Sequence, residues 1–232
     1  MNPSKPSRRG RPVHTAADLF VDGSHPQNTR DRLIEQATEL FYAQGIHATG
    51  LDQILRAVGI SKQAFYKHFP SKEDLAVEAI KMRDARELNA FLEQVAGRAG
   101  PAPRDQLLAA FDVINDWFND PKYEGCIFLT ACAEFPQQHD PVHQAGKAHY
   151  TQCETLFTRV AERAGADDPA ALAKELVLLI EGAMIYRLIC GDNAAAAAAR
   201  KLAEHAVNAR TGPPATTTAA TAAATTATTT AV

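Results

Sequence analysis

The stretch that decides the fold is Gly50-Leu-Asp-Gln-Ile-Leu-Arg-Ala-Val-Gly-Ile-Ser-Lys-Gln-Ala-Phe-Tyr-Lys-His-Phe69. Its first half places apolar residues on one side of a short helix, and Gly59 then permits a sharp turn. Ser61 is suited to cap a second short helix, with Ile60 filling the gap between the two. Two short helices joined in this way predict a helix-turn-helix, whose second helix lies in the DNA major groove.

The outward positions of the second helix suit a nucleic acid. They carry cationic, amide and aromatic hydroxyl groups, namely Lys62, Gln63, Tyr66, Lys67 and His68. Small Ala64 allows close approach to base edges and can touch a thymine methyl. Phe65 and Phe69 lie one turn apart and are expected to face the core.

Simpler interpretations of the same residues stay open. The pattern also fits a plain helical hairpin. Tyr66 could be half-buried with only its hydroxyl in water. His68 could do no more than cap the end of its helix.

The flanking sequence is helical throughout. Residues 33–41 have helical apolar spacing, Asn28 can cap that helix and Gly45 can close it. A second helix is expected to open at Thr49, with Asp52 at the reciprocal capping position, and Ser71 with Asp74 is expected to cap a long helix over residues 71–96. Further helices are expected over residues 104–119, 124–135, 142–164, 168–190 and 193–209. No segment alternates like a strand, so the predicted fold is all-α, a three-helix DNA-binding unit followed by a six-helix unit.

Together with its flanks, the stretch resembles the TetR family of regulators. The matching residues are Thr29-Arg30 through Ala37, Leu40-Phe41, Gly45-Ile46, Thr49, Ile54, Ala57-Val58-Gly59-Ile60-Ser61, Phe65-Tyr66-Lys67-His68-Phe69 and Ser71-Lys72-Glu73-Asp74-Leu75. The resemblance covers residues 28–88 and implies that Tyr66, Lys67 and His68 contact operator DNA, largely its backbone, and that Lys72 adds a phosphate contact. The expected DNA-binding set is Thr49, Gly50, Ser61, Lys62, Gln63, Ala64, Tyr66, Lys67, His68 and Lys72.

Composition limits the class of protein. The net charge of −3 does not by itself indicate DNA binding, although a small basic face is enough for phosphates. Four cysteines without a CxxC pair favour a reducing compartment, and with no secretory signal or membrane span the expected location is the cytoplasm. GxSxG, GxGxxG and P-loop motifs are missing, so no enzyme activity, catalytic residue or cofactor is expected.

Both ends of the chain differ from the helical middle. Residues 1–27 are expected to be a flexible basic leader, and Arg9-Gly-Arg-Pro12 is similar to the core of an AT-hook that enters narrow minor grooves. A merely solubilising leader fits equally well. Residues 211–232 are almost entirely Thr and Ala, which predicts a disordered tail.

Residues 89–210 are expected to bind an effector and to form a dimer. Ligand sites are mostly apolar with a few polar anchors. The expected ligand-binding residues are Phe111, Trp117, Phe128, Phe135, His149, Cys153, Phe157 and Met184, with Glu134, Glu181 and Arg187 as further polar candidates. The alternative is that most of these aromatic residues fill the helical core. The resemblance implies a repressor released from its operator by a small molecule.

Two further hypotheses concern this half. The alternative trigger is a metal or a thiol oxidant acting through His139, His143, His149 and Cys153, although their spacing matches no closed zinc motif, so no metal site is predicted. The homodimer is expected to form through the last two helices. A wide apolar stripe that includes Leu172, Leu176 and Ile180 and the small residues 194–199 suggest a second buried face.

Overall fold

The computed structural model describes residues 28–212, and every regular element in that range is an α-helix. The helices are α1 (Thr29–Gln44), α2 (Leu51–Val58), α3 (Lys62–Tyr66), α4 (Lys72–Ala99), α5 (Pro103–Phe118), α6 (Ile127–Glu134), α7 (Pro141–Arg163), α8 (Pro169–Cys190) and α9 (Ala195–Thr211). The predicted all-α class is confirmed. The expectations for residues 1–27 and for the tail from residue 213 lie outside the described range.

Helix starts follow the capping residues that the sequence contains. Asn28 accepts a hydrogen bond from the Asp31 amide at 3.0 Å, and Ser71 accepts one from the Asp74 amide at 3.0 Å. Each bond satisfies a backbone N–H that the first helical turn leaves without a partner. These two caps are therefore confirmed.

The start of α2 differs from the sequence expectation. The helix begins at Leu51 with Gly50 as its cap residue, and no side chain caps it. Thr49 is fully buried, and its hydroxyl donates to the Gly45 carbonyl at 2.7 Å. The hydroxyl is therefore engaged in closing the loop after α1, which removes it from capping.

Two other boundaries also shift. Helix α4 continues past Gly97 to Ala99 and ends at Gly100, whose φ is +60°. Helix α6 begins at Ile127 rather than at residue 124. The preceding residues form a loop in which the Glu124 amide donates to the Tyr42 hydroxyl of α1 at 3.0 Å.

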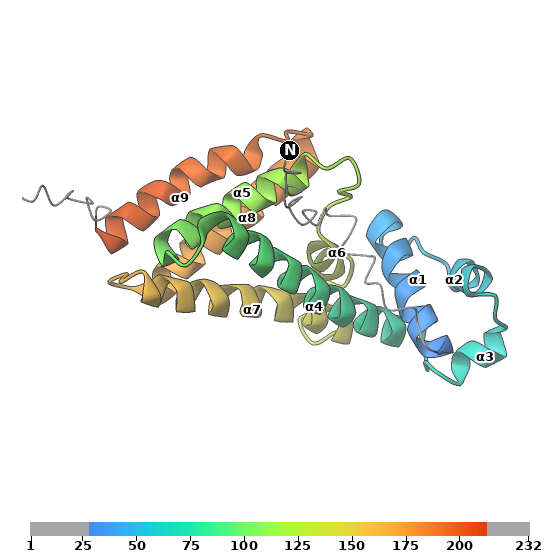
Figure 1. Ribbon diagram of the computed structural model, residues 1–232. Coiled ribbons are helices and arrows are strands. Elements are labelled where there is room, and N and C mark those ends of the chain that lie inside the picture. Colours follow the sequence, from blue (N-terminus) through green and yellow to red (C-terminus); the bar gives the residue numbers. More distant parts are fainter. Residues whose placement is uncertain (1–27, 213–232) are drawn as a thin grey trace, which may run out of the picture.

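The helices enclose two apolar cores. One core joins α1, α2, α3 and the first turns of α4, and α6 adds Ile127, Phe128 and Ala131 to it. The other core lies among α5, α7, α8 and α9. In Figure 1, α1 to α3 form a small group at one end, and the remaining helices form a larger bundle.

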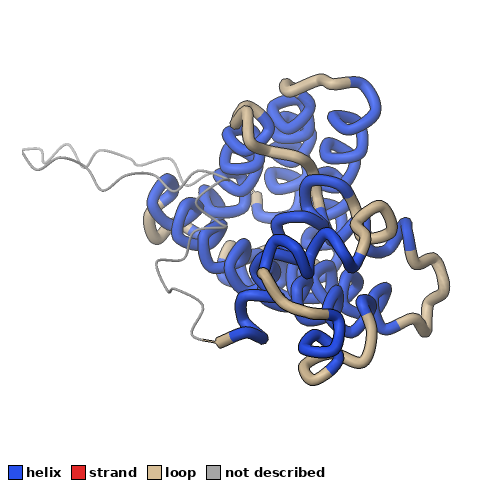
Figure 2. The backbone as a smooth tube through the Cα atoms, turned by 90° about the vertical axis from the view of Figure 1, so that its right-hand side faces the viewer, coloured by secondary structure: helices blue, strands red, loops and turns tan. Residues whose placement is uncertain are grey.

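Helix α4 connects the two groups. It is 28 residues long, so it extends about 42 Å. Its N-terminal half packs against α1, its C-terminal half packs against α5, and α7 also contacts it near its middle, where His149 bonds to Asp84 (Figure 1). Figure 2 shows the molecule from the end that carries α1 to α3. All described segments in it are helices or loops.

Within residues 28–212, no helix has both the length and the apolar character needed to cross a bilayer.

Candidate nucleic-acid interface and effector cavity

Helix α3 is fixed from its inner side. Phe65 is completely buried and packs against Phe69, with ring centroids 5.9 Å apart. Gly59 adopts the left-handed conformation that turns the chain between α2 and α3. The Arg32 guanidinium of α1 donates to the carbonyl of Val58, which ties the end of α2 to α1. The orientation of α3 is therefore set by its core-facing side.

The opposite side of α3 is open to solvent. Tyr66 is 51% exposed, which is compatible both with contact to DNA and with the half-buried aromatic residue of the simpler interpretation. Lys62, Gln63, Lys67 and His68 are exposed beside it, and Gly50 is exposed at the start of α2. These residues have the exposure that contact with DNA requires.

Four members of the expected DNA-binding set are buried, half-buried or engaged in hydrogen bonds within the protein. Thr49 is buried, so its side chain cannot reach DNA and its inclusion in the set was wrong. The ammonium of Lys72 donates to the carbonyls of Ile46 at 2.7 Å and Thr49 at 3.0 Å. Ser61 is exposed but accepts the Ala64 amide at 3.2 Å as a helix cap, and Ala64 is half-buried.

A cavity opens among α4, α5, α7 and α8. Most of its wall is apolar or aromatic, with Glu87, His149, Cys153 and Glu181 as polar members. The lining residues are Glu87, Leu88, Phe91, Ile114, Trp117, His149, Cys153, Phe157, Val177, Ile180, Glu181 and Met184. An apolar wall with a few polar groups is the usual composition of a small-molecule site.

The cavity contains five of the eight ligand-binding residues expected from sequence, namely Trp117, His149, Cys153, Phe157 and Met184. Phe111, Phe128 and Phe135 are instead buried in the two apolar cores. Aromatic content alone does not distinguish cavity walls from core, because both are apolar. Of the additional polar candidates, Glu181 lines the cavity.

The other two polar candidates have structural contacts. Glu134 accepts the backbone amide of His47 at 2.6 Å, between α6 and the loop after α1. The Arg187 guanidinium donates to the Phe118 carbonyl and lies over the Tyr123 ring. Both side chains hold elements together outside the cavity.

Sequence reasoning missed the contribution of α4 to the cavity. Glu87 and Leu88 are adjacent in its second half, and Phe91 lies one turn further along. The sequence predicted a long capped helix over residues 71–96, and none of the expected ligand-binding residues lies on it. The signal was Phe91, an aromatic residue in the middle of a highly charged helix.

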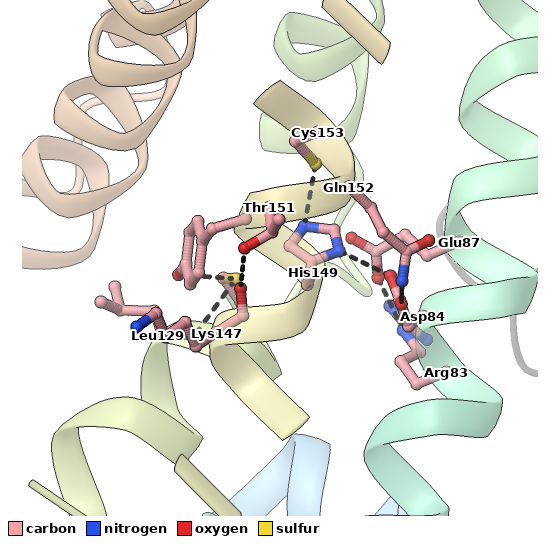
Figure 3. A network of polar contacts seen from close by, with 11 residues as sticks. Arg83, Asp84, Glu87, Leu129, Lys147, His149, Thr151, Gln152 and Cys153 are labelled. Atoms are coloured by element: carbon pink, nitrogen blue, oxygen red, sulfur yellow. Dashed lines mark hydrogen bonds and ion pairs between the residues drawn. The ribbon is translucent and has the colours of Figure 1, made fainter. Parts of the chain in front are cut away.

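His149 is the center of a polar network at the cavity wall (Figure 3). Its Nδ1 donates to the Asp84 carboxylate of α4 at 2.7 Å, and its Nε2 lies 3.5 Å from Cys153 Sγ. Burial alone would lower the pKa of His149, but the hydrogen bonds with Asp84 and Cys153 raise that pKa to about 10. The amide of Gln152 adds a 2.8 Å bond to Asp84. The imidazolium and carboxylate therefore join α7 to α4.

Glu181 of α8 is the other acidic group of the cavity wall besides Glu87. Burial raises its pKa to about 7, although nearby His149 and a hydrogen bond with Tyr150 favour the charged form. Glu87 is paired with Arg83 at 2.7 Å. Glu87 therefore has a guanidinium partner. Ionising Glu181 costs free energy, because that carboxyl group is buried.

The metal alternative receives no support from the geometry. Within the described range, no three His, Cys, Asp or Glu side chains form a group that could hold a metal ion. His143 is buried, with its Nδ1 2.7 Å from the Phe135 carbonyl, and His139 is exposed in the loop before α7. Of the four proposed ligands, only His149 and Cys153 come together.

Comparison with known proteins covers both halves of the chain. The family model "Bacterial regulatory proteins, tetR family" matches residues 33–79, and "Tetracyclin repressor-like, C-terminal domain" matches residues 103–203. A solved TetR-family transcriptional regulator from Streptomyces coelicolor is 30% identical, with 79% of this chain and 96% of that chain covered and a TM-score of 0.69. A solved TetR-type regulator from Streptomyces avermitilis is 29% identical, with 77% and 99% covered and a TM-score of 0.66.

A curated relative agrees with the solved structures. The HTH-type transcriptional regulator YjdC of Escherichia coli is 24% identical over 175 residues, which are 75% of this chain and 91% of that protein. The helix-turn-helix, the all-helical body and these similarities lead to one conclusion: the chain belongs to the TetR family of DNA-binding transcriptional regulators.

Proposed function

We propose that the protein is a homodimeric repressor that leaves its operator when a small molecule occupies the cavity. The observation that carries this proposal is the continuity of α4, which supplies the cavity wall at one end and supports the helix-turn-helix at the other. A ligand that binds more tightly to one position of α4 shifts the population toward that position.

Contacts of α4 near the cavity and at its first turn support a route by which a shift would be transmitted. Lys72, at its first turn, bonds to two carbonyls in the loop between α1 and α2. Glu87 lies 15 residues later in the cavity wall, which corresponds to about 22 Å along the helix. A rigid displacement at the cavity therefore reaches that loop through hydrogen bonds. We assign Lys72 to this positioning role.

Helix α6 provides a second connection. The Phe128 ring stacks on the cavity residue His149, with centroids 3.7 Å apart and planes 9° from parallel. At the other end of α6, Glu134 holds the His47 amide, and the His47 ring lies 4.5 Å from that of Phe135. Movement of His149 would thus also displace the loop before α2.

The proposed dimer surface lies on α8 and α9. Exposed Leu178, Ile185 and Ile189 fall on one face of α8, with Gly182 between them to permit close approach. Leu202 extends this apolar face onto α9 and is 58% exposed. A monomer would leave these large side chains in water, which favours burial against a second copy.

The residues used for the dimer argument at the sequence level need correction. Leu172, Leu176 and Ile180 are buried in the core of their own subunit. Within residues 194–199, Ala195, Ala196 and Ala199 are also buried in it. The expected helices are retained in the proposal, but their opposite faces form the contact. Two α3 helices in such a dimer would read half-sites about 34 Å apart.

The test of DNA reading uses the exposed face of α3 and the protein's own promoter region. Lys67→Ala and Tyr66→Ala should each weaken operator binding in fluorescence anisotropy titrations over a range of salt concentrations. If Lys67 contacts a phosphate, its loss should also reduce the slope of log affinity against log salt by about 1.

Lys122→Ala is the matched control, because Lys122 is an exposed lysine in the loop after α5. It should leave both the affinity and the slope unchanged. Unchanged affinity in both α3 variants would show that this face does not read DNA.

A further inference from the structure

The charged groups around the cavity are unevenly paired. Glu87 has Arg83 at 2.7 Å, and Asp84 has His149 at 2.7 Å. Glu181 accepts a hydrogen bond from Tyr150 and has no ion pair with any described residue. Since His149 is already bonded to Asp84, its charge is largely compensated before it acts on Glu181.

Apart from His149, which is paired with Asp84, the cavity wall formed by the described residues contains no cationic group. Phe91, Trp117 and Phe157 bring aromatic rings from three different helices to the cavity, and aliphatic residues complete it. An ionised carboxylate in such surroundings is poorly solvated, and the cost is relieved when a cation comes into contact with it. Aromatic rings also attract cations through their electron-rich faces.

Building on the proposed effector-responsive function, we propose that the cavity binds a lipophilic amine in its protonated form. The ammonium group contacts the Glu181 carboxylate, and the apolar body lies among Phe91, Trp117 and Phe157. This assigns a chemical class to the effector and identifies Glu181 as the residue that selects it.

Other ligand charges fit the wall less well. An anion would lie beside Glu181 and would be repelled by it, because Glu87 is paired with Arg83 and His149 with Asp84. A neutral ligand of the same shape would fill the apolar space but leave the charge of Glu181 without a counter-ion. The cavity should therefore rank three otherwise equal ligands in the order ammonium, neutral, carboxylate.

The single tryptophan of the chain makes this order measurable. Trp117 lines the cavity and is the only Trp in the sequence, so its fluorescence reports directly on occupancy. The full-length protein is titrated at neutral pH with 4-ethylbenzylamine, 4-ethylbenzyl alcohol and 4-ethylbenzoate. The amine should bind at least about tenfold more tightly than the alcohol, because it adds a buried ion pair to the same apolar contact.

Two glutamate variants identify the group responsible. Glu181→Gln keeps the shape of the side chain and removes its charge, so it should weaken amine binding at least about tenfold. The same variant should bind the alcohol within about twofold of the parent, which also shows that it is folded. Glu154→Gln, on the exposed side of α7, is the matched control and should change neither affinity.

The outcomes separate this inference from the proposed function. The inference is overturned if the alcohol or the carboxylate binds as tightly as the amine. It is also overturned if none of the three probes binds, or if Glu181→Gln leaves amine affinity unchanged. Operator binding by the ligand-free parent protein is measured in parallel, because its absence would contradict the proposed function instead.

Discussion

Gly146 is a residue for which one added carbon should matter. It lies on α7 where that helix crosses α6, and a Cβ there would lie 2.9 Å from the Phe128 carbonyl oxygen and 2.9 Å from Cys132 Sγ. Because a backbone atom cannot move away freely, we expect Gly146→Ala to lower the free energy of unfolding by about 1–3 kcal/mol. Urea unfolding monitored by circular dichroism measures this change.

A second glycine provides the control for this prediction. Gly97 is an exposed residue inside α4, and a Cβ there would meet no atom within 4 Å. Gly97→Ala should raise the free energy of unfolding by about 0.5–1 kcal/mol, because alanine loses less conformational freedom in a helix. Equal effects of the two substitutions would contradict the close packing of α6 on α7.

Local residue chemistry could be predicted wherever a side chain acts on its own neighbours in sequence. The caps formed by Asn28, Ser61 and Ser71 depend on contacts within three residues, and all three were foreseen. Thr49 and Lys72 bond across the loop between α1 and α2 instead. Their roles depend on tertiary geometry, which the local pattern does not contain.

At the scale of elements, one largely buried ion pair, Asp84 with His149, joins α4 to α7. Asp84 binds both His149 and Gln152, so Asp84→Asn leaves the imidazole without its counter-charge. We expect a loss of about 3 kcal/mol in unfolding free energy at pH 7, measured by urea unfolding. Asp105→Asn, at an exposed site on α5, should change it by less than about 1 kcal/mol.

The effect of Asp84→Asn should also depend on pH. The pKa of His149 is raised to about 10 in the folded protein, above its ordinary value of 6.5. The stabilisation from the charged pair is therefore fully present below about pH 6.5 and is lost as the pH rises through about 10. The stability difference between parent and variant should shrink over that range. A constant difference would mean that His149 is neutral in the native protein.

Helix positions could be predicted from periodicity, but the division between core and cavity could not. Phe128 and Phe157 are equally apolar and both lie on helices, yet only Phe157 borders the cavity. Phe128 of α6 faces the core that contains α1 to α3, whereas Phe157 of α7 faces the opening among α4, α5 and α8. A single sequence does not specify how helices cross. The contribution of α4 was missed for the same reason.

For the whole molecule, assembly should depend on the exposed face of α8. Leu178 is 62% exposed in the single chain and would be buried in the proposed dimer. Leu178→Glu would place a charge in that contact, so we expect mostly monomer and much weaker operator binding. Light scattering after size-exclusion chromatography measures the mass of the particle.

Leu92→Glu is the matched control for assembly. Leu92 is also an exposed leucine, 40% accessible, but it lies on α4 away from the α8 and α9 surface. This variant should keep the mass of the parent protein. A Leu178→Glu variant that remained a dimer would place the contact between subunits elsewhere.

The completion of the N-terminal core by α6, which follows α5 in the sequence, also affects how these proteins can be recombined. A chimera joined near residue 88 would keep α1 to α3 from this protein but take α6 from another family member. Ile127, Phe128 and Ala131, which complete the core of α1 to α3, would then be replaced. Chimeras of two family members should therefore fold best when α6 is inherited together with the first four helices. We therefore expect new specificity in this protein to arise by substitutions within each half. Substitutions in α4 and in α6 are expected to occur together.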